Sequence, residues 1–385
     1  MSSLIRNRAA STPEMLAAMG DLTMVRAALY FEAALARALA AEGVIATSDA
    51  EAIATACASL PVDIPALADA AAHAGTLAIP LIAQIRGRVG ADAANKVHMG
   101  ATSQDLADTA LILQAKAAGA LIEAALDRVL KGLVALTETH ATTPMLGRTL
   151  LQGALPITFG LKTAHWLLAV EAARARFKAE QKGALMLQFG GAVGSYPGLG
   201  GKGFAVAKRL ADVLGLACPP LSWHARRDGI AGLACALAII TGAVAKIARD
   251  ISLLAQNEVA EAFEPPIAGR GTSSAMSHKR NPTSCQLTLS AALRAPSLAA
   301  TILSALPQEH ERGLGGWQAE APVLAELYQL AHGALSAMAV VIEGLEVDTG
   351  KMRANLDAAG VGGDVGESAA LARRALERTR DVHDQ

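Results

Sequence analysis

The chain has 385 residues, of which 52% are hydrophobic, 3% aromatic and 18% charged, and its formal net charge is -1. This length allows a large core in two or three domains. A nearly neutral chain lacks the excess of basic residues that binding to nucleic acid or to an anionic membrane surface requires, so we expect neither partner.

The N-terminal residues 1–101 have the pattern of short helices. Thr12-Pro13 is typical of a helix cap followed by a first turn, and Ser48 with Glu51 predicts a capping box for a later helix. Between these signals, apolar residues recur at near-helical spacing at Val25, Leu29, Leu35 and Leu39. We assign residues 1–101 to an N-terminal helical domain. Its start lacks the apolar core of a signal peptide, so we expect a cytoplasmic protein.

Residues 102–346 change in character to long helices, with no convincing strand-like alternation of polar and apolar residues. Alanine, the best helix former, supplies much of the apolar content. The expected helices cover 105–138, 156–186, 227–261, 283–306 and 321–345. Helical segments longer than about 25 residues indicate a bundle. We therefore predict an all-α protein whose central domain, 102–346, is a long-helix bundle.

One stretch of this domain, 229–245, has no charged residue and is a candidate membrane span. It contains glycines and is only marginally long enough to cross a bilayer, so we expect a buried helix of the bundle instead. After the bundle, glycines mark a loop, and 367–380 has the pattern of a polar helix. Residues 347–385 are expected to be a short C-terminal region.

Polar residues collect in loops that precede the long helices. In the first loop, 97–109, Ser103 is a natural N-cap, and the Thr102 and Ser103 hydroxyls lie at the positive end of a helix, where a carboxylate could bind. Capping alone would also explain these residues. In a second loop, 147–160, the residues by themselves indicate only a turn followed by a helix that begins at Pro156.

The third loop, 269–285, combines glycines, serines and a group of cations with almost no bulky apolar residue. Such a segment contributes little to a core, and its hydroxyls, N–H groups and positive charges could hold an anion. An ordinary solvated loop is the alternative. Asn281-Pro282 is expected to end the loop and to open the next helix.

These three loops resemble the signature motifs of the fumarase/aspartase superfamily. Residues 272–282 resemble its GSSxMPxKxNP loop, with Thr272 and Ser277 as departures; Thr102, Ser103 and Asp105 resemble its TSxD motif. Residues 147–160 resemble its GRTHxQxAxPxTxG block, but Leu150 stands in place of the histidine. The resemblance implies a substrate-binding set comprising His98, Thr102, Ser103, Arg148, Thr149, Gln152, Asn281 and Arg312.

Two further segments narrow the resemblance to the 3-carboxy-cis,cis-muconate cycloisomerase family. Residues 309–320 are similar to its HERxLGGWQAE run, and residues 221–228 to its WHxxRD segment. The family reaction closes a lactone by intramolecular carboxylate addition and proton transfer, with no metal or organic cofactor. The chain ends early relative to the family pattern, so the C-terminal region is expected to be a shortened remnant.

The resemblance also implies catalytic roles. Ser273 is carried over as the proton-transfer group, Lys279 and Asn281 as the groups that stabilise the enediolate, and His140 is a weaker acid–base candidate. Helix N-termini at Ser103 and Thr283 are expected to assist. A homotetramer with shared sites is implied as well. The cations near the motifs that could bind a third anionic group of the substrate are Arg148, Arg227, Arg270, Arg280 and Arg312.

Three alternatives remain open. An elimination lyase acting on adenylosuccinate or argininosuccinate uses related motifs, although Leu150 and the segment around Trp317 argue against it. An inactive structural homologue is the second. A nucleotide-binding enzyme is the third, because 198–203 fits GxGxxG, but no strand pattern precedes that stretch.

Overall fold

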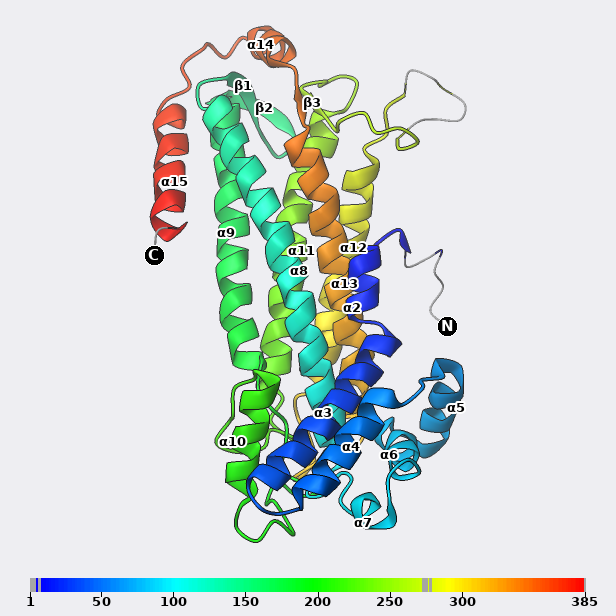
Figure 1. Cartoon of the computed structure of the whole chain (residues 1–385). Coiled ribbons are helices and arrows are strands. Elements are labelled where there is room, and N and C mark those ends of the chain that lie inside the picture. Colours follow the sequence, from blue (N-terminus) through cyan, green and yellow to red (C-terminus); the bar gives the residue numbers. More distant parts are fainter. Residues whose placement is uncertain (1–4, 6–7, 272–275, 277–278, 384–385) are drawn as a thin grey trace.

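The computed structural model describes residues 5, 8–271, 276 and 279–383. Its centre is a bundle of long helices that run the length of the molecule (Figure 1). They are α8 (Ser103–Thr139), α9 (Phe159–Ala184), α11 (Asp228–Leu254), α12 (Thr283–Ser304) and α13 (Gly316–Glu343). Contacts close them into a ring in the order α8, α9, α11, α12, α13 and back to α8, with α11 also touching α13. The predicted all-α bundle is confirmed.

Shorter helices lie at the two ends of the bundle and along its sides. They are α2 (Pro13–Ala18), α3 (Asp21–Ala41), α4 (Thr47–Ser59), α5 (Ile64–Ala74), α6 (Ala78–Arg86), α7 (Ala91–Ala94), α10 (Gly203–Leu214), α14 (Thr349–Ala358) and α15 (Ser368–His383). The cap at Thr12 is confirmed, because its hydroxyl accepts a hydrogen bond from the Met15 N–H at 3.3 Å. The capping box at Ser48 is wrong: α4 already begins at Thr47, so Ser48 lies within the first turn.

The expectation of a helix from Pro156 is also wrong. Residues Pro144–Thr149 (β1) and Gln152–Thr158 (β2) form an antiparallel hairpin, and α9 begins only at Phe159, capped by the Thr158 hydroxyl. Pro156 fits because a two-stranded ribbon leaves N–H positions that need no ladder partner. The two turn residues, Leu150 and Leu151, have φ of 51° and 66°. They lack the Asn-Gly signature that normally reveals such a turn in a sequence.

Two helix boundaries were also misplaced in the sequence-based prediction. Helix α11 ends at Leu254 rather than at Glu261, because the chain turns there and then pairs β3 (Ala262–Phe263) with β4 (Glu346–Val347). Helix α13 begins at Gly316, before the expected residue 321. Both β-pairings and α14 gather at one end of the bundle, the top of Figure 1.

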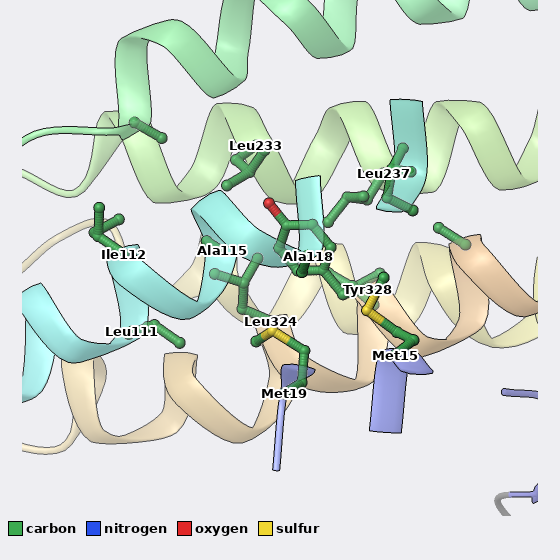
Figure 2. Packing of buried hydrophobic residues seen from close by; sticks show 14 of the residues in the cluster. Met15, Met19, Leu111, Ile112, Ala115, Ala118, Leu233, Leu237, Leu324 and Tyr328 are labelled. Carbon is green, nitrogen blue, oxygen red and sulfur yellow. The ribbon is translucent and has the colours of Figure 1, made fainter. Parts of the chain in front are cut away.

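The core of the bundle is packed mainly from leucine, isoleucine, valine and alanine, and Figure 2 shows a part of it where methionines meet the buried Tyr328. Met15 and Met19 from the N-terminal segment fill space beside α13, and small residues such as Ala115 and Ala118 on α8 allow the helices to approach closely. Tyr328 is 0% exposed, and its hydroxyl has no hydrogen-bond partner among the described residues.

Helices α8, α11, α12 and α13 are long and apolar enough, by length and composition only, to cross a membrane. In the bundle, 61% of the most apolar window of α8, α11 and α13 is buried, but only 28% of that of α12. Residues 229–245 therefore lie in a largely buried bundle helix, as predicted, whereas α12 leaves most of its apolar face uncovered in the single chain.

Candidate active site

The first group of predicted residues lies where α8 begins, at the bottom of Figure 1, beside the loop that joins α12 to α13. Thr102, rather than the predicted Ser103, is the N-cap, and Ser103 is the first helical residue. The Arg312 guanidinium donates from Nη1 to the Thr102 hydroxyl at 2.6 Å and from Nε to the Gln104 side-chain oxygen at 3.4 Å. A cation thus lies at the positive end of a helix with neutral partners, an arrangement that attracts an anion.

Asp105 holds the start of α8 in place. Its buried carboxylate accepts hydrogen bonds from the N–H groups of Thr102 and Gly191, both at 2.9 Å, and from His224 Nε2 at 2.6 Å. The pairing holds the turn at Gly191 and the segment around His224 against α8. Asp105, the aspartate of the TSxD motif, therefore serves to position the start of α8.

Arg227, the residue before α11, is fully buried. It donates two hydrogen bonds to the Asp108 carboxylate, at 2.7 and 2.9 Å, and is also paired with Glu320 of α13. Burial raises the pKa of Glu320, against the opposing effect of the Arg227 charge. The expectation that Arg227 offers a free cation to a substrate anion is wrong, because a guanidinium already held by two carboxylates has no charge to spare.

His98 completes this group, which we call the basal cluster: His98, Thr102, Ser103, Gln104, Asp105 and Arg312. Its ring Nδ1 lies 2.6 Å from a carboxylate oxygen of Glu32, a buried residue of α3. Burial lowers the pKa of His98, but the charge and hydrogen bond of Glu32 outweigh it, and the pKa lies above its ordinary value. The structure thus brings together four of the predicted residues.

The other predicted residues lie at the opposite end, on the hairpin and on the loop before α12. Arg148 donates to both carboxylate oxygens of buried Glu261, at 2.8 and 2.7 Å, and Asn355 of α14 donates to the same group. This pairing neutralises the Arg148 charge and anchors the hairpin. Thr149 and Gln152 lie at its exposed tip, where Leu150, in the position of the superfamily histidine, is 96% exposed.

His140 lies at the same end, as the residue that terminates α8. Its Nδ1 is 3.1 Å from the Thr143 hydroxyl, and its ring meets Phe159 edge-on with centroids 5.2 Å apart. Burial lowers the pKa of His140, so the neutral imidazole is favoured near neutral pH. A neutral ring can accept a proton, so the environment is compatible with a base.

Lys279 and Asn281 line a cavity of about 350 Å³ at this end, together with Arg270, Arg280 and the segment 263–268. We call it the apical cavity. Arg280 is paired with Glu346 at 2.7 Å, whereas Arg270 bonds to the neutral Ser284 hydroxyl at 3.1 Å. Ser273, the predicted proton-transfer group, lies outside the described residues.

The start of α12, expected to stabilise substrate charge, already holds a carboxylate of the chain itself. Glu264 accepts hydrogen bonds from the N–H groups of Ser284 at 3.1 Å and Cys285 at 2.7 Å. The positive end of this helix is thereby compensated within the chain. Lys279, Asn281 and Arg270, rather than the helix terminus, remain as groups that could receive a developing negative charge here.

The basal cluster and the apical cavity are separated by the whole of α8. This helix has 37 residues, which corresponds to a length of about 55 Å at 1.5 Å per residue. A single chain therefore cannot bring Arg312 and Lys279 to one small substrate.

Residues 8–296 match the family model described as lyase. The chain belongs to the lyase family. The chain is 49% identical over 351 residues to a 3-carboxy-cis,cis-muconate cycloisomerase of Bradyrhizobium diazoefficiens, covering 90% of the chain and 78% of that protein. A protein of the same description from Pseudomonas aeruginosa is 46% identical, over 89% of the chain and 75% of its own length.

Among solved structures, the chain is similar to the 3-carboxy-cis,cis-muconate lactonizing enzyme from Pseudomonas putida. The TM-score is 0.87 at 39% identity, and the match covers 99% of the chain and 88% of the solved one. The similarity therefore extends over both ends of the bundle, including the hairpin.

Several residues that organise the candidate site were not identified from the sequence. They are the buried acidic and amide groups Glu32, Gln104, Asp108, Glu261 and Glu320, and the half-buried Glu264. Their common signal is a carboxylate or amide within an apolar helical face or beside a helix start. Such a residue costs free energy unless it is paired, so it marks a partner elsewhere in the chain.

Proposed function

We propose that this chain is a cycloisomerase that closes 3-carboxy-cis,cis-muconate, or a close 3-substituted anion such as 3-sulfomuconate, to its muconolactone. The observation that carries the proposal is the 49% identity, over 90% of the chain, to a protein named for this reaction. We place the reaction in the catabolism of aromatic compounds, in the protocatechuate branch of the beta-ketoadipate pathway, and in the cytoplasm.

In the proposed reaction one substrate carboxylate oxygen forms a bond to a diene carbon, and the electron pair displaced from that double bond moves toward the carbon alpha to another carboxylate. The resulting enediolate carries extra negative charge on its oxygens. Preorganised cations and amide donors lower the free energy of such a species most effectively. We assign this role to Lys279 and Asn281 of the apical cavity.

A proton then adds to the alpha carbon, which restores the carboxylate and completes the lactone. We assign the transfer to Ser273, on the loop between Arg270 and Lys279, where neighbouring cations would stabilise the alkoxide that remains when the hydroxyl gives up its proton. His140 is the second candidate, because burial lowers its pKa and so makes its protonated ring a stronger proton donor.

We assign the remaining substrate carboxylates to the basal cluster. The hydroxyls of Thr102 and Ser103 lie at the positive end of α8, and Arg312 adds a cation whose partners are neutral. A substrate with three anionic groups needs such a cation for the group that plain cis,cis-muconate lacks. His98 adds a further donor to the same group.

We further propose a homotetramer in which each site combines residues from different subunits. The separation of the basal cluster and the apical cavity supports this, because only another copy can supply the missing half. The uncovered apolar face of α12 and the exposed Leu150 and Leu151 at the hairpin tip supply surface for the contacts. Multi-angle light scattering of an active preparation tests the assembly, and a stable active monomer would contradict it.

An ultraviolet assay tests the reaction. Purified protein is mixed with 3-carboxy-cis,cis-muconate, with its 3-sulfo analogue, and separately with adenylosuccinate and argininosuccinate. Loss of the conjugated diene absorbance supports the proposal. The muconate that is converted at the higher rate identifies the substituent at position 3. Release of fumarate without diene loss would assign an elimination lyase, and no turnover of any substrate would assign an inactive structural homologue.

A further inference from the structure

The contact between Glu32 and His98 combines two unfavourable features. Glu32 is 1% exposed, and the other buried residues of α3 are apolar. One of its oxygens lies 2.6 Å from His98 Nδ1, whereas the other, Oε2, is buried with no partner among the described residues. His98 itself has φ of 65°, in the left-handed region that residues other than glycine rarely adopt.

Neither feature is explained by stability. A buried carboxylate with one partner costs several kcal/mol of desolvation, and an apolar side chain of similar volume would serve the α3 core better. Strained backbone conformations and costly buried charges that coincide at one contact are typical of functional sites. The contact is also placed well for function, because His98 comes shortly before Thr102 and Ser103 at the start of α8.

The geometry of the ring leaves one nitrogen available. Nδ1 faces Glu32 and must carry the proton, since an ionised carboxylate only accepts hydrogen bonds. Nε2 has no hydrogen-bond partner among the described residues, and the side chain is 12% exposed. A carboxylate that orients a histidine through one nitrogen so that the other can act is a recurring arrangement in enzymes.

We propose that Glu32 is a positioning residue that holds His98 as an imidazolium, with Nε2–H directed to donate to a carboxylate of the substrate. This inference rests on the proposed function for the identity of the substrate, a polycarboxylate. In it Glu32 supplies the counter-charge that keeps His98 protonated, and the positive φ of His98 fixes the direction of the ring.

The other charged groups around the pair act in both directions. Asp105 on α8 favours the protonated ring, and Arg86 on α6 disfavours it. Cys57 on α4 lies beside Glu32, and burial followed by the Glu32 charge raises its pKa to about 12, so the thiol stays neutral. Glu32 is therefore the dominant counter-charge, and removing it should leave His98 neutral under the conditions of turnover.

The first measurement needs no substrate. The full-length protein is labelled with ¹³C and ¹⁵N in histidine only, and the His98 signals are assigned by their loss in His98→Gln. In the wild-type protein Nδ1 should remain protonated above the His98 pKa. Glu32→Gln should lower that pKa by about one to three pH units, the usual effect of losing an adjacent opposite charge. Glu51→Gln, the same change at an exposed glutamate of α4, should leave it unchanged.

The second measurement is the pH dependence of kcat/KM for 3-carboxy-cis,cis-muconate. Activity that needs protonated His98 falls as pH rises through its pKa, so Glu32→Gln should move this alkaline limb to lower pH. At pH 8 kcat/KM should then drop by roughly tenfold or more. Glu32→Asp, which keeps the charge, should restore part of the activity.

The outcomes separate the two proposals. An unchanged His98 pKa in Glu32→Gln overturns the inference, and so does an unprotonated Nδ1 in the wild-type protein. The protonation of Nδ1 is measured in the wild-type protein, so this test can be made even if the variant fails to fold. A shifted pKa with an unshifted activity profile overturns the substrate-facing role. If wild-type protein turns over no muconate, the proposed function fails, and the NMR readings alone decide the Glu32–His98 pair.

Discussion

Replacement of Arg312 by methionine should remove the preference for a three-anion muconate over plain cis,cis-muconate. Arg312 is the arginine of the basal cluster, and its partners, Thr102 and Gln104, are neutral, so its charge is available to the substrate. Arg270 also has a neutral partner, Ser284, but it lies at the apical cavity. Arg148 and Arg227, by contrast, are held by buried carboxylates. The third anionic group therefore depends on Arg312 for its charge-assisted hydrogen bond.

The expected size follows from the cost of leaving such a group unpaired. A desolvated charged partner that loses its hydrogen bond costs about 2–4 kcal/mol, which is roughly thirty- to a thousandfold in kcat/KM. The wild-type enzyme should show this ratio between the two muconates, and Arg312→Met should reduce it to within about tenfold. Most of the change should come from the three-anion substrate.

The assay is the loss of diene absorbance for both substrates, measured at low and high salt. Arg226→Met is the matched control, because Arg226 is an exposed arginine paired with Asp228, and removing it changes the net charge equally. The ratio should survive in this control. An unchanged ratio in an active Arg312→Met enzyme would refute the reasoning, and a wild-type preference insensitive to salt would assign the selection to shape rather than charge.

Three further predictions concern single side chains. Ser273→Ala should lower kcat by orders of magnitude with little change in substrate affinity; near-normal turnover would transfer the proton-transfer role to His140. Tyr328→Phe should raise the free energy of unfolding by up to about 1–2 kcal/mol, because it removes a buried hydroxyl that has no partner among the described residues. The control Tyr30→Phe loses a 2.9 Å hydrogen bond to the Val213 carbonyl and should lower the free energy of unfolding. Both are measured by thermal unfolding at a fixed protein concentration. Burial lowers the pKa of His332, so its contribution to stability is present above the unfolded pKa of 6.5 and is lost as pH falls. His332→Gln should therefore flatten the fall in Tm below pH 6.5, and an equally steep fall in the variant would contradict this.

The sequence was sufficient to predict the bundle, because long alanine- and leucine-rich stretches leave little choice but buried helices. It was not sufficient for the hairpin. Leu150 and Leu151 occupy turn positions with positive φ, a conformation that leucine gives no reason to expect. The pairing of the two strands depends on contacts that the local residue pattern does not reveal. Pro156 was therefore interpreted as the first residue of a helix.

For the site, the motifs identified residues that the structure places in two groups, the basal cluster and the hairpin with the apical cavity, but their pairing was not predictable. Arg148 and Arg227 look alike in sequence as spare cations, and both are neutralised by glutamates distant along the chain. A local pattern carries no information about such partners. The same limit hid Glu264, whose carboxylate compensates the start of α12.

Helix α8 carries Thr102 at one end and His140 at the other, and this has a consequence for symmetry. A neighbour that lies antiparallel to it, related by a twofold axis across the helix, brings its apical cavity to the basal cluster. The same axis then performs the reverse exchange at the far end. Complete sites would therefore be created two at a time, and an assembly built in this way contains an even number of them.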